Sequence, residues 1–396
     1  MILVVIIFLI LGMLAGTITG LIPGIHLNLV GAILISYTFL EKLPPEVTIV
    51  FIISMSITHT FLDFIPSIFL GAPDDDTALS ILPGHDLLKK GKGYEAIYLT
   101  TIGSLFSIPL IILMSLIFLF ILNKTSGYIS LTIPYLLILS SIFLISQEKL
   151  KLSAIIIFLL SGFLGLASLN LPLNQPFLPL LSGLFGASTI IISIKNKTRI
   201  PKQEIRKFTF PKFKKIKTPL FFSLIASSLC SVLPGIGAGQ AAVIGSSFKK
   251  LSKRQFLILL GATNTIVLGL SFIVFYTIGR TRTGMASFLS QSIISLTQNQ
   301  IIILLTTIII IGIINFYWTM FLGKLISKNM DKIPYKFLNI FILGLLTFLV
   351  IFISGFLGLL VFIVATAVGI FGILSNVRRI NLMGVLVIPT IIIYLI

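Results

Sequence analysis

The sequence predicts an all-α, polytopic integral membrane protein, and two observations carry this prediction. Apolar residues make up 57% of the 396-residue chain and charged residues only 10%, which is far from the composition of soluble domains. The apolar runs, such as residues 155–164 and 301–312, are continuous, whereas the strands of a membrane β-barrel alternate polar and apolar residues. We therefore expect helices that cross a bilayer.

Apolar segments follow one another along the chain in two series. A full crossing needs about 20 residues, so the shorter segments are expected to be re-entrant half-helices, and about ten spans plus re-entrant helical hairpins result. The first series is 2–22, 27–40, 47–66, 68–83, 94–122, 128–146, 152–169 and 176–194. The second is 219–233, 238–248, 255–278, 284–296, 301–322, 337–354, 356–374 and 382–396.

A basic linker, residues 195–217, separates the two series. It holds ten Lys and Arg residues against Glu204 alone. Because Lys and Arg are enriched in cytoplasmic loops, we expect a cytoplasmic linker in a multi-pass protein of the plasma membrane. The net charge of +18 has the same explanation, so no nucleic-acid partner is expected. The first segment lacks a basic n-region and an obvious cleavage site, which predicts a retained helix.

The two series resemble each other, which predicts two homologous membrane repeats, 1–194 and 218–396. The string at 161–166 returns at 354–359, and the Pro-Gly pair at 23–24 returns at 234–235. The charge map and the repeated string favour parallel halves, whereas the prevalence of inverted repeats among hairpin transporters favours the opposite, so orientation stays open. Hairpins are expected near 22–28, 62–84, 233–240 and 278–296.

Each Pro-Gly pair is followed by amide or imidazole side chains, a pattern typical of an anion site. A helix that begins after such a break exposes backbone N–H groups and about half a positive charge. The alternatives are a kink that permits close helix packing and, for the arginine, a loop charge at the membrane surface. The predicted anion-binding residues are Pro23, Gly24, His26, Asn28, Pro234, Gly235, Gly237, Gly239, Gln240 and Arg280.

Five of the eleven carboxylates lie within residues 62–93, in an otherwise apolar region that Pro66, Pro83 and Gly84 are expected to break. Charge at membrane depth costs roughly 2.5–3.5 kcal/mol per residue, so it is normally paired or lines a wet cavity. Such groups can carry a proton or help bind Na⁺. An interfacial helix end and a helix N-cap are the alternatives. The predicted coupling-cation residues are His59, Asp63, Asp74, Asp75, Asp76 and Asn264.

Signatures of enzymes and metal sites are missing from the sequence. The three histidines are scattered, Cys230 is the single cysteine, and neither a Walker loop nor a Gly-x-Ser-x-Gly elbow occurs. We therefore expect no enzymatic activity, no structural metal and no cofactor beyond a coupling ion, Na⁺ or H⁺.

Several motifs point to a known family. They are Gly20 to Gly24, Gly71-Ala72-Pro73 with Thr77-Ala78-Leu79, Pro83-Gly84-His85, Lys90 to Gly93, and Pro234 to Gly237. The chain in this respect resembles the large permease subunit of the tripartite tricarboxylate transporters (TctA-like), in particular its archaeal-type branch. The resemblance implies ion-driven uptake of an organic anion with an extracytoplasmic binding protein and a small membrane subunit. Bacterial members carry small residues where Asp74 to Asp76 stand.

Three functions stay open at this stage. The leading hypothesis is a secondary active transporter that moves a di- or tricarboxylate-like anion coupled to Na⁺ or H⁺. A carrier or flippase for polyprenyl phosphate or another lipid phosphate is the alternative, and a non-transporting membrane scaffold is the third. A sealed polar cavity would favour the secondary transporter, and a groove open to lipid would favour the lipid-phosphate carrier. Helix breaks that are closely packed, with no cavity, would favour the scaffold. A homo-oligomer is also open.

Overall fold

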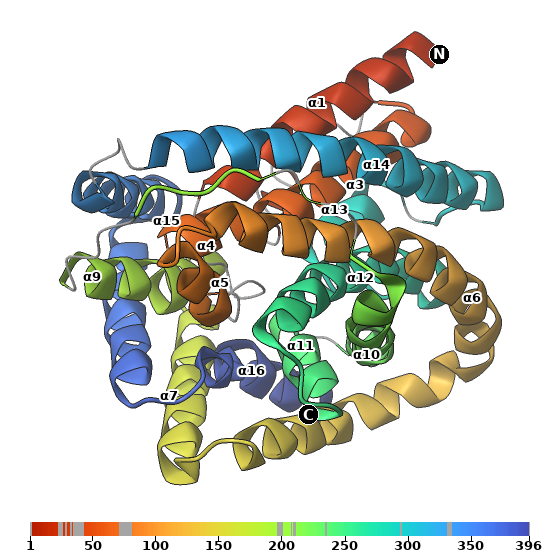
Figure 1. Ribbon diagram of the computed structural model, residues 1–396. Coiled ribbons are helices and arrows are strands. Elements are labelled where there is room, and N and C mark those ends of the chain that lie inside the picture. The colour runs from red at the N-terminus through yellow and green to blue at the C-terminus, as the bar shows by residue number, and fades with distance from the viewer. Residues whose placement is uncertain are drawn as a thin grey trace.

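The computed structural model describes residues 2–22, 27, 30–31, 34, 43–70, 81–195, 201–206, 208, 211–233, 236–293, 295–330 and 335–395. Within these ranges the regular structure is helical throughout, and no strand occurs, which confirms the all-α prediction. Figure 1 shows long helices that surround a central group of helices.

The helices of the first half, in chain order, are α1 (Ile2–Leu21), α3 (Pro45–Leu62), α4 (Phe64–Leu70), α5 (Ile81–Leu88), α6 (Gly93–Ser146), α7 (Lys151–Leu169), α8 (Phe177–Leu181), the π-helical η3 (Ser182–Ala187) and α9 (Ser188–Lys195). Those of the second half are α10 (Phe213–Val232), α11 (Ala238–Ser247), α12 (Lys253–Ile278), α13 (Gly284–Ser292), α14 (Gln298–Asn329), α15 (Tyr335–Leu374), the 3₁₀-helical η5 (Arg379–Met383) and α16 (Gly384–Leu395).

Within the described residues, eight helical stretches are long and apolar enough to cross a membrane. Two shorter apolar helices, Thr132–Ser146 and Arg379–Leu395, accompany them. The protein is thus a multi-pass membrane protein. The eight stretches are Ile2–Leu21, Pro45–Phe69, Gly93–Leu122, Lys151–Leu169, Phe177–Lys195, Lys253–Ile278, Gln298–Asn329 and Lys336–Leu374.

Two of these spans form the centre of the molecule. The apolar window of α12 is 100% buried and that of Pro45–Phe69 is 94% buried, against 11% for α1. Close packing of backbones holds this centre, as is usual for helices in lipid. A Cβ added at Gly261 of α12 would lie 2.0 Å from the Thr100 carbonyl oxygen of α6, and one at Gly16 of α1 would lie 2.3 Å from Met55 O of α3.

Packing crosses repeatedly between the two halves of the chain. Helix α6 packs against α12, and α3 packs against α14. Helix α7 packs against α16, while α15 packs against the α8–η3–α9 stretch. Within the halves, α1 packs on α3 and α10 packs on α12. The halves are therefore interlocked and do not form separate domains side by side.

Of the helix breaks expected at prolines, one occurs and one does not. Helix α3 ends at Leu62, Asp63 forms a turn, and α4 begins at Phe64. Pro66 has no N–H to offer the Leu62 carbonyl four residues earlier, so the helix is interrupted at Asp63, and Pro66 itself lies inside α4. Pro83 and Gly84 lie inside α5, which corrects the prediction of a break there.

One further element differs from the expected segments, and another agrees with them. The segments expected at 94–122 and 128–146 join into the single 54-residue helix α6, which bends around one side of the molecule in Figure 1. No proline lies between Pro109 and Pro134, so the backbone ladder can continue through residues 123–131. The segments expected to meet at residue 355 are the two parts of α15, which are separated at Gly355, where φ is 68° and ψ is −167°, values outside the helical region.

The described part of the linker is fastened to the α5–α6 turn. The side chain of Gln203, which is 7% exposed, accepts a hydrogen bond from Gly93 N at 2.7 Å and donates to Leu88 O at 3.2 Å. Phe208 stacks on Tyr98 with ring centroids 4.6 Å apart. One linker side chain thus caps the end of α5 and the start of α6.

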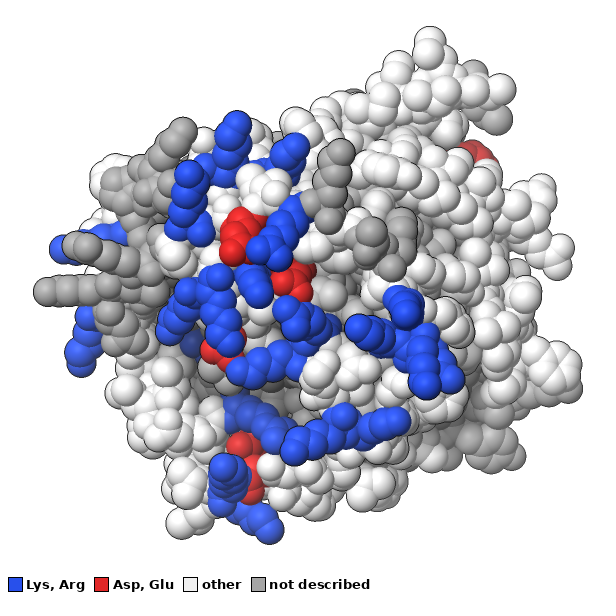
Figure 2. Space-filling model, in the orientation of Figure 1, with Lys and Arg blue, Asp and Glu red and all other residues white. Residues whose placement is uncertain are grey.

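Lysines and arginines gather on one face of the molecule, and Figure 2 looks onto this face. We call it the basic face. It carries exposed cationic side chains from the linker and from several helix ends. Charge contacts link several of these helix ends: Lys253 with Asp86, Arg254 with Glu95, Arg378 with Glu148, and both Lys89 and Arg379 with His85. Within the linker, residues 213–217 belong to α10, so the basic stretch ends in a helix.

Candidate functional site

A buried polar contact joins the two central helices. Asp63 at the end of α3 is 4% exposed, and its Oδ2 accepts a hydrogen bond from Asn264 Nδ2 of α12 at 2.7 Å. One turn earlier, the hydroxyl oxygens of Thr60 and Thr265 lie 3.3 Å apart. A buried carboxylate is costly unless it is hydrogen-bonded, and Asn264 supplies a bond. The structure therefore brings together two of the predicted coupling-cation residues.

His59 lies one turn before Asp63 but contacts another helix. Its Nδ1 is 3.1 Å from Thr19 Oγ1 of α1, and its carbonyl oxygen accepts the Asp63 N–H at 2.9 Å. The two side chains therefore contact different neighbours of α3. Together they connect α1, α3 and α12 through polar groups inside an apolar bundle.

Sequence reasoning missed the polar residues of α14. Asn315 is fully buried, and the hydroxyl oxygen of Thr58 on α3 lies 3.1 Å from its Oδ1 and 3.0 Å from its Nδ2, within hydrogen-bond distance of both. Trp318 Nε1 donates to Thr17 Oγ1 of α1 at 3.0 Å. The available signal was an amide, and the single tryptophan of the chain, inside a long apolar run. A buried amide in such a run needs a polar partner, which α3 provides.

The second-half helix break forms a capped helix start. Helix α10 ends at Val232, and α11 begins at Ala238 after the extended residue Gly237. Gln240 is 2% exposed, and its Oε1 accepts the Gly237 N–H at 2.7 Å. Its Nε2 has no hydrogen-bond partner among the described residues. Gln240 thus uses its oxygen as a cap and keeps its donor available, while Gly239 is buried beside it.

Arg282 lies at this break. Its Nε donates to Leu233 O at 3.2 Å, and its Nη2 donates to Ile236 O. The Arg280 guanidinium lies 5.9 Å from the centre of the Tyr394 ring of α16. Arg280 is the predicted anion-binding arginine, and this role stays a prediction. A spacing of two residues in a loop could not distinguish them.

A small cavity of about 10 Å³ lies beside the start of α11, which is room for about one water molecule. Its polar lining comes from Gln240, Asn381, Ser140 and Ser141. The remaining lining residues are apolar. The cavity is lined by Ser140, Ser141, Leu144, Ile145, Phe158, Ile236, Gln240, Ile380, Asn381, Met383 and Val387.

Charged groups on α5 lie outside the membrane-spanning helices. Burial lowers the pKa of His85 to about 4, helped by the positive charges of Lys89 and Arg379 and opposed by Asp86. An ion pair with Lys253 lowers the pKa of Asp86. His85 is therefore neutral at neutral pH. No group of three His, Cys, Asp or Glu side chains suited to a metal ion occurs among the described residues.

Nine predicted site residues lie outside the described part of the chain. They belong to the first Pro-Gly break, the acidic cluster and the second Pro-Gly pair. They are Pro23, Gly24, His26, Asn28, Asp74, Asp75, Asp76, Pro234 and Gly235.

Comparison with known proteins identifies the family. The profile of the tripartite tricarboxylate transporter TctA family matches residues 6–384. The chain belongs to the TctA family. It is also 34% identical over 405 residues to the "Uncharacterized protein MJ1079" of Methanocaldococcus jannaschii, and the match covers 98% of each chain. No solved structure matches the chain. The resemblance seen in the motifs is thereby confirmed, and TctA proteins are components of transporters.

Proposed function

We propose that this TctA protein is a secondary active transporter that moves a di- or tricarboxylate-like anion coupled to Na⁺ or H⁺. The carrying observation is the buried Asp63 carboxylate, held by Asn264 between the two central helices. An ionisable side chain at such a place marks an ion pathway in many membrane proteins. Asp63 is the coupling group in this proposal, because its protonation or Na⁺ binding changes the charge between α3 and α12.

The anion is bound at the start of α11 in this proposal. Gly237 and Gly239 carry no side chain that would block a ligand oxygen at the start of α11, and the buried Gln240 Nε2 adds a directional donor. Arg282 supplies a positive charge to the same break. The present cavity is too small for a carboxylate ligand, so binding requires the elements around it to separate.

We further propose that the halves are inverted repeats. We match α1, α3, α6 and α7 with α10, α12, α14 and the second part of α15. Two main contacts then have counterparts: α3 with α14 matches α12 with α6, and α1 with α3 matches α10 with α12. Basic loops in one half match loops without Lys or Arg in the other: 89–92 matches 293–297, and 378–379 matches 170–176. All basic loops share a face only if one half is inverted, and this face, linker included, is then cytoplasmic.

Inversion suits alternating access, because rocking one half against the other exposes a central site to each side in turn. Membership of a tripartite family also leads us to propose two partners, a small membrane subunit and an extracytoplasmic binding protein. These partners would deliver the substrate, whereas the translocation path lies in this chain.

The test is binding followed by flux. Purified protein is melted with citrate, succinate, inorganic phosphate or a polyprenyl phosphate, since a ligand of the native state raises the melting temperature. We expect stabilisation by citrate or succinate, and gradient-driven uptake of that ligand into proteoliposomes. Stabilisation by the polyprenyl phosphate alone would replace this proposal with a lipid-phosphate carrier. Failure of all four ligands would overturn it.

A further inference from the structure

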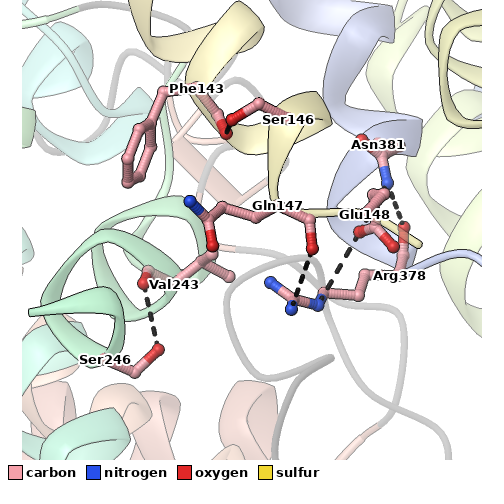
Figure 3. A network of polar contacts seen from close by, with 8 residues as sticks. All are labelled: Phe143, Ser146, Gln147, Glu148, Val243, Ser246, Arg378 and Asn381. Atoms are coloured by element: carbon pink, nitrogen blue, oxygen red, sulfur yellow. Dashed lines mark hydrogen bonds and ion pairs between the residues drawn. The ribbon is translucent and has the colours of Figure 1, made fainter. Parts of the chain in front are cut away.

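A second buried carboxylate, Glu148, lies in the turn between α6 and α7 and has no role so far. It is 7% exposed, and its Oε1 accepts a hydrogen bond from Asn381 Nδ2 at 3.1 Å. Arg378 Nε lies 3.7 Å from the same oxygen. Figure 3 shows the Arg378 guanidinium directed at Glu148 and at the backbone of Gln147. A buried acid is thus shared between an amide and a cation.

Arg378 differs from Glu148 in its exposure. Its side chain is 45% exposed and belongs to the basic face, whereas that of Glu148 is 6% exposed. Its other contact with a neighbouring element is a long one, from Nη2 to Gln147 O at 3.5 Å. A guanidinium binds carboxylates through a fork of N–H groups, and here Glu148 approaches through Nε while part of the group faces outward.

Asn381 connects this pair to the break at α11. It donates to Glu148 and to Arg378 O, and it lines the small cavity together with Gln240 and Ile236. Polar groups therefore follow one another from the basic face inward: Arg378, Glu148, Asn381, the cavity and Gln240. The other walls of the cavity are apolar. An anion that moves from the start of α11 toward the basic face therefore meets polar groups along this line.

We propose that Glu148 is an internal counter-ion of Arg378, and that a carboxylate of the substrate displaces it there. Arg378 is then an anion-contact residue at the basic-face end of the path, which rests on the proposed function. The exchange replaces one carboxylate by another on the same guanidinium, so the charge pairing of Arg378 is conserved. Asn381 continues to donate to Glu148, which limits the cost of leaving a buried acid without its cation.

The deciding variant is Glu148→Gln, because it keeps the shape and the acceptor for Asn381 but removes the competing charge. We expect citrate or succinate, whichever stabilises the wild-type protein, to bind about tenfold more tightly to Glu148→Gln and about tenfold more weakly to Arg378→Gln. The double variant should resemble Arg378→Gln. Arg378→Lys keeps the charge but loses the fork and should weaken binding by an intermediate factor.

A matched control separates displacement from general electrostatics. Asp86 and Lys253 form another acid–base pair on the basic face, and both side chains are largely exposed. Asp86→Asn also removes one negative charge from this face, but it should leave the dissociation constant for citrate or succinate unchanged. An equal gain in affinity in Asp86→Asn and Glu148→Gln would overturn the inference, because bulk charge would explain both.

The two proposals fail in different ways. If neither citrate nor succinate binds the wild-type protein, the proposed function falls. If the wild type binds one of them and Glu148→Gln binds it no more tightly, only the displacement inference is overturned. The melting temperature of each ligand-free variant checks its fold. If Glu148→Gln does not fold, the affinity of Arg378→Lys for citrate or succinate tests the anion contact instead, because this variant retains a cation for Glu148.

Discussion

Asn264 donates its side-chain amide to the Asp63 carboxylate at 2.7 Å, across 201 residues of sequence. Asp63→Asn preserves the shape and can still accept from Asn264, but it can neither bind a proton nor attract Na⁺ as a charge. We therefore expect gradient-driven uptake to fall by about tenfold or more while the melting temperature changes little. Uptake is measured in proteoliposomes with and without a Na⁺ or pH gradient.

Thr60→Val is the matched control for this coupling prediction. It removes the neighbouring hydroxyl contact between α3 and α12 without touching a charge. It should cost about 1 kcal/mol of stability and leave the dependence on the gradient intact. An Asp63→Asn protein whose uptake responds to the gradient as the wild type does would remove Asp63 from coupling.

Gly237→Val tests the anion site at the start of α11. The residue has φ −85° and ψ −179°, a conformation that valine adopts readily, so the fold should survive. The new side chain occupies the approach to the backbone N–H groups, and we expect affinity for citrate or succinate to fall by about tenfold or more. Gly344→Ala on α15, where a Cβ meets nothing within 4 Å, should bind normally. Normal binding by Gly237→Val would place the anion elsewhere.

Arg282→Lys tests which arginine serves the break. The lysine retains the charge but cannot hold both the Leu233 and Ile236 carbonyls with one fork, so we expect a loss of about 1–3 kcal/mol of stability together with weaker anion binding. Arg280→Lys, with its side chain over Tyr394, should have the smaller effect on binding. The reverse order, measured by melting and titration, would restore Arg280 as the anion residue.

His85 predicts a dependence of stability on pH. Its pKa is about 4 in the folded protein and 6.5 in the unfolded chain, so between these values the unfolded chain binds a proton that the folded protein does not. The free energy of unfolding is therefore fully retained above pH 6.5 and falls as the pH drops toward about 4, by about 3 kcal/mol. His85→Gln should flatten this part of the curve. An identical pH profile for the two proteins would contradict the prediction.

Much of the fold could be predicted because apolar runs and helices share their limits. The segment expected at 152–169 is α7, Lys151–Leu169, and the one at 238–248 is α11, Ala238–Ser247. The points where helices are interrupted or continue were harder to predict. Pro66 interrupts the helix three residues before its own position. The continuity of α6 depends on backbone hydrogen bonds, which the pattern of apolar residues does not reveal.

The candidate site was predictable only in part. Asp63 and Asn264 were found because polar residues stand out in apolar runs at corresponding places of the two halves. Arg282 was not among the predicted site residues, because the direction of two nearby loop side chains depends on tertiary packing. Glu148 and Arg378 were passed over because charges at helix ends look like topology signals, and burial distinguishes the acid from the others.

Gln203 bears on the order in which the protein is made. Its side chain completes the start of α6 and the end of α5, yet it is synthesised after α9. While the ribosome is still producing the first half, Gly93 N and Leu88 O therefore lack their final partner. The α5–α6 turn reaches its mature form only once the linker has emerged, so the turn joining two early helices is finished by a residue that the chain supplies more than a hundred positions later.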